Sequence, residues 1–200
     1  MASQMEERGQ FGASRIEGDA AKSPIMIVLA GLPGCGKSNF CFDLFEEQDA
    51  SSPWVVVCQD TLGTRKRCED AVKEALVSGH RVVVDRCNQS VAQRKHWVDL
   101  ANEHWPFKEA EKLADVTCLY FNTPYDVCVA RCKARDDHPT VSSADAEKII
   151  GCQAKEFQKP TLDEGFCSIV TMEPGDTPFY REIVRKMAQP YDARDPTLRV

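Results

Sequence analysis

Three glycines, a lysine and a serine stand close together in residues 31–38, which read GLPGCGKS and fit the pattern G-x-x-x-x-G-K-[ST]. In a loop of this type, backbone N–H groups and the N-terminus of the next helix surround an anion. The lysine reaches the β- and γ-phosphates of a nucleotide, and the serine hydroxyl binds Mg²⁺. An ordinary glycine-rich turn would need neither side chain, so the motif predicts a phosphate-binding loop. The residues expected to contact ATP are Gly31, Gly34, Cys35, Gly36, Lys37 and Ser38.

Two aspartates stand at the ends of apolar runs farther along the chain. Asp60 follows the run 54–58, and Asp85 closes the run 81–85. Ligands of parallel α/β sheets bind at the carboxyl ends of the strands, so both carboxylates are expected near the phosphate loop. Asp85 fits a position that holds Mg²⁺ directly or through water, although helix caps and turns also use aspartate. Asp60 would accept the proton of an attacking hydroxyl group, or it would serve only as a turn residue within "QDTLG".

Two arginines, Arg131 and Arg135, are four residues apart and would project from one face of a helix. They stand beside the polar stretch "DDHPTVSS". At the foot of a mobile segment, such a pair would close over a polyphosphate and neutralise the charge that develops during phosphoryl transfer. Arginines at this spacing are also common on solvent-exposed helix faces, so the phosphate loop is what favours the functional interpretation.

The elements that must position these side chains alternate along the chain. Apolar runs predict five strands, at residues 25–30, 54–58, 81–85, 116–121 and 167–172. Helices are expected between and after them, within residues 37–47, 64–79, 88–104, 124–135, 144–157 and 179–189. Ser90 is expected to cap the third of these helices. The alternation predicts an α/β fold with a parallel sheet covered by helices on both faces.

The length of 200 residues fits one such domain, expected at 24–188, between a mobile leader at 1–23 and a polar tail at 189–200. The leader lacks the apolar stretch of a secretory signal, and no run approaches the ~20 apolar residues of a membrane span. We therefore expect an intracellular, soluble protein, in the nucleus or the cytoplasm.

The net charge of −6 excludes a generic basic protein that coats nucleic-acid backbones, so any nucleic-acid contact must be local. The ten cysteines include no C-x-x-C pair, which favours reduced thiols that pack as small apolar side chains over zinc ligands. Cys35, inside the phosphate loop, is the thiol expected to be exposed and sensitive to oxidation.

Four stretches carry a family resemblance: "AGLPGCGKS", "CQDTLGTRKRC", "VVVDRCNQSVAQRKHWVDLA" and the R-x-x-x-R of residues 131–135. Together they resemble the P-loop kinase domain of the polynucleotide 5′-hydroxyl kinase family, from about Ile25 to about Met187. The chain is similar in particular to the kinase module fused to aprataxin-like proteins of plants and fungi, where an "EGF" recurs near the last strand. Here that motif is Glu164-Gly165-Phe166.

The resemblance implies five parallel strands in the order 2-3-1-4-5, a lid, and transfer of the ATP γ-phosphate to a nucleic-acid 5′-hydroxyl. It implies that Asp60 is the general base, that Asp85 is a carboxylate at the metal, and that Arg131 and Arg135 are the lid arginines. Lys37 and Ser38 would hold phosphate and Mg²⁺. Family members often have arginine in place of Gln59, and some have it in place of Gly63. The residues that would replace those contacts to the acceptor strand are Arg65, Lys66, Arg67 and Arg86.

The sequence thus predicts an ATP- and Mg²⁺-dependent kinase of DNA or RNA 5′-hydroxyl ends, acting in nucleic acid repair or RNA processing, alone or within a larger repair or ligation protein. Two alternatives stay open. A kinase of a small metabolite is favoured by the acidic charge and disfavoured by the D-T-L-G and D-R-C-N stretches. A non-catalytic ATP-binding module is permitted by Gln59 and Gly63, whereas Asp60 and the two arginines argue against it.

Overall fold

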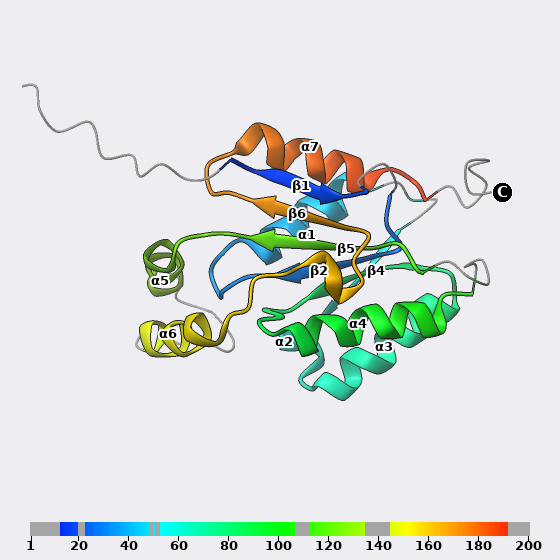
Figure 1. Cartoon of the computed structure of the whole chain (residues 1–200), viewed down its shortest axis with the longest axis horizontal. Coiled ribbons are helices and arrows are strands. Elements are labelled where there is room, and N and C mark those ends of the chain that lie inside the picture. The colour runs from blue at the N-terminus through cyan, green and yellow to red at the C-terminus, as the bar shows by residue number, and fades with distance from the viewer. Residues whose placement is uncertain are drawn as a thin grey trace, which may run out of the picture.

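A six-stranded sheet forms the centre of the protein (Figure 1). The computed structural model describes residues 13–19, 23–48, 50, 53–106, 113–134 and 145–191. The strands are β1 (Arg15–Gly18), β2 (Met26–Ala30), β3 (Trp54–Cys58), β4 (Arg81–Asp85), β5 (Val116–Phe121) and β6 (Ser168–Met172). They lie in the order β1-β6-β5-β2-β4-β3. Strands β2 to β6 are parallel to one another, whereas β1 pairs antiparallel with β6.

The parallel part of the sheet confirms the predicted topology, because the order β3-β4-β2-β5-β6 is 2-3-1-4-5 when the five predicted strands are numbered along the chain. The prediction of five strands was wrong in number, and the sheet is mixed rather than all parallel. The sixth strand, β1, comes from residues that were expected to belong to the leader. All four of its residues are exposed, so no apolar pattern marks it in the sequence, and backbone pairing with β6 attaches it to the sheet.

Seven α-helices and one short 3₁₀-helix connect the strands within the described residues. They are α1 (Lys37–Glu47), α2 (Gln59–Leu62), α3 (Arg65–Val77), α4 (Val91–His104), α5 (Tyr125–Lys133), α6 (Ala146–Glu156), the 3₁₀-helix η1 (Leu162–Glu164) and α7 (Thr177–Ala188). Ser90 caps α4 as predicted, since its side chain accepts a hydrogen bond from the Gln93 N–H at 3.3 Å. A turn within "QDTLG" was predicted only as the alternative role of Asp60, and the helix α2 was not predicted, because four residues show no apolar periodicity.

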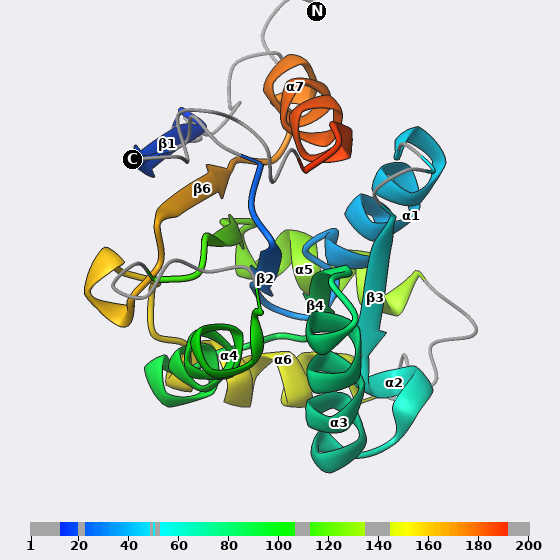
Figure 2. The same cartoon turned by 90° about the vertical axis from the view of Figure 1, so that its right-hand side faces the viewer.

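Two cores cover the two faces of the sheet, as the sequence predicted. Along β2 the buried side chains alternate between them, because successive residues of a strand point to opposite faces. Ile27 and Leu29 pack with residues of α1, α5 and α7. Met26 and Val28 pack with residues of α3 and α4. Figure 2 shows α1 and α7 on one side of the sheet and α3 and α4 on the other.

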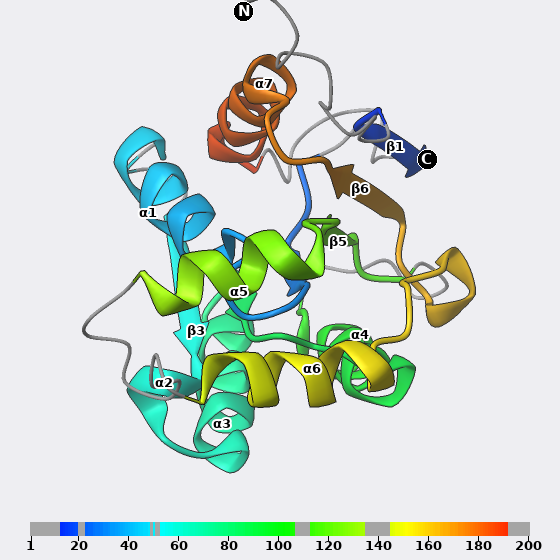
Figure 3. The same cartoon turned by 90° about the vertical axis from the view of Figure 1, so that its left-hand side faces the viewer.

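The carboxyl ends of the parallel strands face the end of the molecule at which α5 and α6 lie (Figures 1 and 3). The short helix α2 follows β3 directly at this end. No helix in the described part of the chain is long and apolar enough to cross a membrane.

Candidate active site

The phosphate loop joins β2 to α1, and its glycines permit a backbone that other residues would not tolerate. Gly34 has φ +80°, and a Cβ atom there would lie 2.6 Å from the Cys128 carbonyl oxygen and 2.8 Å from the Cys132 sulfur. Cys128 and Cys132 are both buried on α5, as predicted for core residues. The loop can therefore pack directly on α5 only because residue 34 has no side chain.

The N-terminus of α1 is open to a ligand. Its N-cap residue is Gly36, at φ +115°, and no side chain caps the first turn or adds an acidic group there. Backbone N–H groups at a helix N-terminus otherwise need a capping side chain, water or a ligand, and the helix dipole favours an anion at this end. This end of α1 therefore suits a phosphate group.

Lys37 is buried inside the loop. Its ammonium group donates hydrogen bonds to the Gly31 and Leu32 carbonyl oxygens at 3.0 and 2.9 Å. Burial opposes the charged form, but the Cys35 and Cys87 sulfurs and the Asp85 carboxylate outweigh it and raise the pKa of Lys37 above its ordinary value. The site therefore holds a fixed positive charge.

Cys35 is buried, with 4% of its surface exposed, so the expectation of an exposed thiol was wrong. Its sulfur lies inside the loop, where it accepts a hydrogen bond from the Lys37 ammonium group at 3.5 Å. Among the described cysteines, the exposed one is Cys152 on α6.

Ser38 and Asp85, the two predicted metal ligands, lie side by side. The Ser38 hydroxyl donates a hydrogen bond to Asp85 Oδ2 at 3.2 Å. Burial raises the pKa of Asp85, while Lys37 and Ser38 act in the opposite direction and the nearby Asp60 adds to the rise. Hydroxyl and carboxylate oxygens are the hard ligands that Mg²⁺ takes, so this pair fits the metal that the sequence predicted.

A pocket with a volume of about 340 Å³ brings the predicted residues together. Asp60 enters it from the first turn of α2 and Asp85 from the end of β4, facing the phosphate loop. The lining residues are Pro33, Gly34, Gly36, Lys37, Ser38, Gln59, Asp60, Asp85, Arg86, Cys87, Asn88, Gln89, Gln93 and Gln153. The two carboxylates therefore share one cavity with the anion-binding end of α1, as their places at the strand ends predicted.

Arg131 reaches the phosphate loop from α5. Its Nη1 atom donates hydrogen bonds to the Gly34 and Cys35 carbonyl oxygens, both at 3.4 Å. Arg131 also lines a second cavity of about 410 Å³, which shares Gly36 with the first. Arg135, the other predicted lid arginine, and His138 lie outside the described residues.

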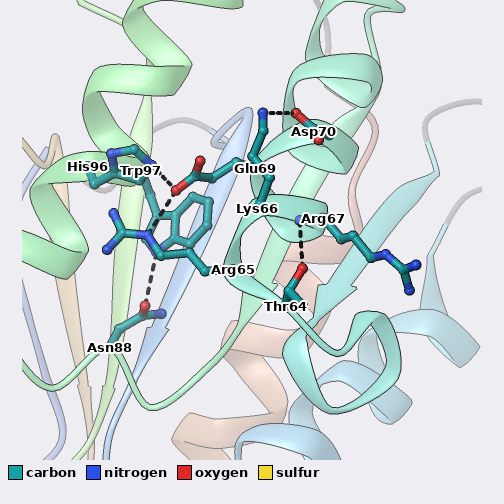
Figure 4. Close-up of polar contacts among 9 residues, drawn as sticks. All are labelled: Thr64, Arg65, Lys66, Arg67, Glu69, Asp70, Asn88, His96 and Trp97. Atoms are coloured by element: carbon teal, nitrogen blue, oxygen red, sulfur yellow. Dashed lines mark hydrogen bonds and ion pairs between the residues drawn. The ribbon is translucent and has the colours of Figure 1, made fainter.

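The four predicted acceptor contacts divide into two groups, and Figure 4 shows three of them, Arg65, Lys66 and Arg67. Arg65 and Lys66 form ion pairs within α3, with Glu69 at 2.8 Å and Asp70 at 2.6 Å. Glu69 also lies 3.0 Å from His96, through the same oxygen that binds Arg65. The structure therefore places Arg65 and Lys66 on an exposed surface where neighbouring carboxylates already balance their charge.

Arg86 and Arg67 differ from that pair. Arg86 lines the pocket, lies half-buried over the Trp97 ring at 5.7 Å, and has its pKa lowered by burial. Arg67 forms no ion pair within the described part of the chain, and Figure 4 shows its guanidinium group pointing away from Arg65 and Glu69. Of the four, the structure brings Arg86 to the pocket, whereas Arg67 is exposed on α3 and does not line it.

Asn88 fixes the turn after β4, a role that the sequence did not reveal. It is a non-glycine residue at φ +44°. Its amide donates a hydrogen bond to the Leu29 carbonyl oxygen at 2.7 Å and accepts one from the Trp97 indole at 3.0 Å. The last residue of the D-R-C-N stretch thus ties the end of β4 to β2 and α4.

A buried ion pair supports this turn. Arg94 on α4 binds both carboxylate oxygens of Glu164 on η1 at 2.7 Å and donates to the Asn88 carbonyl oxygen at 2.9 Å. Arg94 and Glu164 are almost completely buried, at 0% and 2% exposed. The glutamate of the "EGF" stretch was noted in the sequence, but nothing in its spacing indicated the arginine partner 70 residues away.

One known family matches half of the chain. Residues 59–160, half of the chain, match the family model described as AAA domain. The chain belongs to this family. The matched residues of this chain include Asp60, Asp85 and Arg131.

Curated relatives cover most of the chain at moderate identity. "Transcription factor bHLH140" of Arabidopsis thaliana is 29% identical over 178 residues, which are 85% of this chain and 18% of that protein. "Bifunctional polynucleotide phosphatase/kinase" of Schizosaccharomyces pombe is 29% identical over 144 residues, or 72% of this chain and 32% of that protein. The putative protein of the same kind from Acanthamoeba polyphaga mimivirus is 34% identical, with 74% and 32% covered. The chain therefore spans at most about a third of the length of these relatives.

Solved structures share the fold. Kti12 of Chaetomium thermophilum, in complex with ADP-AlF3, has a TM-score of 0.59 at 13% identity, covering 81% of this chain and 96% of its own. A fungal RNA kinase has a TM-score of 0.59 at 17% identity, with 87% and 88% covered. A gluconokinase of Sinorhizobium meliloti 1021 has a TM-score of 0.53 at 19% identity, with 84% and 91% covered. At these identities the likeness shows the P-loop kinase fold alone.

Proposed function

We propose that the protein transfers the γ-phosphate of ATP to the 5′-hydroxyl end of DNA or RNA. The observation that carries this proposal is a single pocket in which the open N-terminus of α1, the Ser38–Asp85 pair and the Asp60 carboxylate meet. A phosphate-binding helix end, hard oxygen ligands and a carboxylate near a place for an acceptor hydroxyl are the parts that phosphoryl transfer requires.

ATP would lie with its polyphosphate along the loop. The backbone of Gly34 to Ser38 and the Lys37 ammonium group would bind the β- and γ-phosphates. The second cavity, of about 410 Å³, shares Gly36 with the first and would hold the nucleoside. Ser38 and Asp85 would hold Mg²⁺, which supplies charge neutralisation on the phosphate oxygens when it is bound.

The chain's own residues would then carry the transfer. Asp60 accepts the proton of the 5′-hydroxyl as that oxygen forms a bond to the γ-phosphorus. The bond between this phosphorus and the oxygen bridging to the β-phosphate breaks, and ADP leaves. Lys37 and Arg131 stabilise the negative charge that moves onto the departing diphosphate.

A polynucleotide acceptor is supported by the relatives and by the pocket. Two relatives are named bifunctional polynucleotide phosphatase/kinase, and the D-T-L-G and D-R-C-N stretches line the pocket through Asp60, Asp85 and Asn88. Arg86 in the pocket is suited to a phosphate of the first nucleotides of a strand. Repair or RNA processing would be the process served by such an activity.

A kinase of a small metabolite is the rival function. It is favoured by the ion pairs of Arg65 and Lys66, which leave less positive charge for a nucleic-acid strand, and by the net charge of −6.

The two functions differ in their acceptor, and one assay separates them. The protein is incubated with Mg²⁺ and ATP labelled at the γ-phosphate, with matched DNA and RNA oligonucleotides bearing 5′-hydroxyl ends, or with sugars, polyols and nucleosides. Label on the oligonucleotides is expected. Label on a small hydroxyl compound alone would show the rival function, and ATP binding without label on any acceptor would show a non-catalytic module.

A further inference from the structure

Helix α6 lies alongside α5 and ends beside α4, at the carboxyl end of the sheet (Figure 3). Its first turn is bound to α5, since Lys133 pairs with Glu147 at 2.7 Å and the Tyr125 hydroxyl donates to the Glu147 carbonyl oxygen at 3.2 Å. In the middle of the helix, Ile150 is completely buried in the core. The helix is therefore a fixed part of the pocket wall at this end.

The other end of α6 is bound to the start of α4. The Gln89 amide donates to Glu156 at 3.2 Å, and the Val91 N–H donates to the Gln158 side chain at 2.9 Å. The Gln158 N–H in turn donates to the Gln89 carbonyl oxygen at 2.8 Å. Between these two attachments, one turn after Ile150, α6 contributes Gln153 to the lining of the pocket.

Gln153 carries an unsatisfied polar atom. Its Oε1 atom is shielded from solvent and has no hydrogen-bond partner among the described residues. Buried polar atoms nearly always have a partner, because an unmade hydrogen bond costs free energy on folding. A carboxamide oxygen can only accept, so once the Gln153 side chain turns and exposes Oε1 to the pocket, the partner of this atom must be an O–H or N–H group.

Other neutral amides line the pocket as well. Besides Gln153, carboxamides come from α4, from the turn before it and from α2, as Gln93, Gln89 and Gln59. Phosphate groups are acceptors at neutral pH and offer nothing to a carboxamide oxygen. A nucleoside offers sugar hydroxyl groups and base amino or imino groups, which are suitable donors for Gln153.

We propose that Gln153 is a specificity residue that accepts a hydrogen bond from an O–H or N–H group of the acceptor's 5′-terminal nucleoside. The inference rests on the proposed function. Neutral amides of the pocket recognise this nucleoside, and the phosphates that follow it in the strand are recognised as well. Gln153 acts on acceptor binding, whereas ATP binding and proton transfer belong to other residues.

The test is Gln153→Met, which keeps the length of the side chain and removes the amide. The KM of a 5′-hydroxyl oligonucleotide is expected to rise roughly threefold to tenfold, the scale of one hydrogen bond, with kcat and the KM of ATP unchanged. The Kd of a fluorescent 5′-hydroxyl oligonucleotide, measured by anisotropy without ATP, should rise by the same factor. Because Oε1 has no partner to lose in the free protein, the melting temperature should not fall. Gln189→Met, at an exposed glutamine outside the pocket lining, is the matched control.

Acceptor variants identify the donor group. If it is the sugar 2′-hydroxyl, the effect of Gln153→Met disappears when the terminal ribose is replaced by deoxyribose. If it is a base group, the effect disappears with an abasic 5′ nucleotide. An effect that persists with both changes, or an unchanged acceptor KM and Kd, overturns the inference, as does a fall in melting temperature with unchanged KM. A parent protein that labels no oligonucleotide overturns the proposed function first, and the inference with it.

Discussion

The Ser38 hydroxyl donates a hydrogen bond to the Asp85 carboxylate at 3.2 Å, although 47 residues separate them in the sequence. Ser38 stands in the first turn of α1, and Asp85 is the last residue of β4, which pairs in parallel with β2. The sheet register therefore brings the two predicted Mg²⁺ ligands together without any ligand present, which reduces the ordering that metal binding would require.

Replacing Lys37 with alanine should lower phosphoryl transfer at least ~100-fold, because the ammonium group supplies positive charge where the β- and γ-phosphates would lie. Steady-state transfer to a 5′-hydroxyl oligonucleotide measures this. Lys155→Ala, at an exposed lysine on α6, should leave the rate unchanged. Near-normal turnover by a folded Lys37→Ala protein would show that the phosphate loop takes no part in phosphoryl transfer.

The loop and the strands could be predicted because their signals are local. The residues of the GLPGCGKS motif are enough by themselves to indicate phosphate binding. Buried parallel strands appear in the sequence as apolar runs. From the strand ends, the places of Asp60 and Asp85 beside the loop followed. The strand order came from the family resemblance, and the structure confirms it for the five parallel strands.

The parts that could not be predicted depend on contacts between distant residues. β1 has no apolar pattern, and it is attached to the sheet by backbone pairing with β6, which is far away in the sequence. The expectation of an exposed Cys35 took no account of the inward turn of its side chain toward Lys37. The Arg94–Glu164 pair and the place of Gln153 arise from how helices pack. The spacing of residues along the sequence does not show this packing.

Arg131→Ala should slow transfer about 100-fold while changing ATP binding little, because an arginine at a transferring phosphoryl group acts mainly on the transition state. Single-turnover rates and the Kd of ATP, measured side by side, check this. Arg185→Ala, at an exposed arginine on α7 that lines neither cavity, is the control. Equal losses in rate and in binding would make Arg131 an ordinary ATP contact. The predicted role of Arg135 is tested in the same way.

Glu164→Leu should destabilise the protein by about 3–5 kcal/mol, because it leaves the buried Arg94 guanidinium without its carboxylate. Urea unfolding measures the change. The double variant Arg94→Met/Glu164→Leu should recover part of the loss, since no charge then remains buried. A double variant less stable than Glu164→Leu would contradict this account of the pair.

Glu69→Gln should strengthen binding of the acceptor strand. The change weakens the ion pair that holds Arg65, so the guanidinium group becomes available to the phosphates of the strand. The oligonucleotide KM should fall roughly twofold, the scale of an exposed ion pair, and its dependence on salt should become steeper. Asp99→Asn releases Lys95 from an equivalent pair on α4 and should have no effect. An unchanged oligonucleotide KM with unchanged salt dependence for Glu69→Gln would show that Arg65 contributes nothing to acceptor binding.

The measurement that bears most directly on the proposed phosphoryl transfer is the activity of Asp60→Asn. Asparagine keeps the shape of the side chain and removes the negative charge that would accept the hydroxyl proton. The variant should bind ATP and Mg²⁺ as the parent does, yet lose ~10²–10⁴ in the rate of phosphorylation of a 5′-hydroxyl oligonucleotide, the usual contribution of a general base. Full activity in Asp60→Asn, or a parent protein that phosphorylates only a small metabolite, would contradict the assignment.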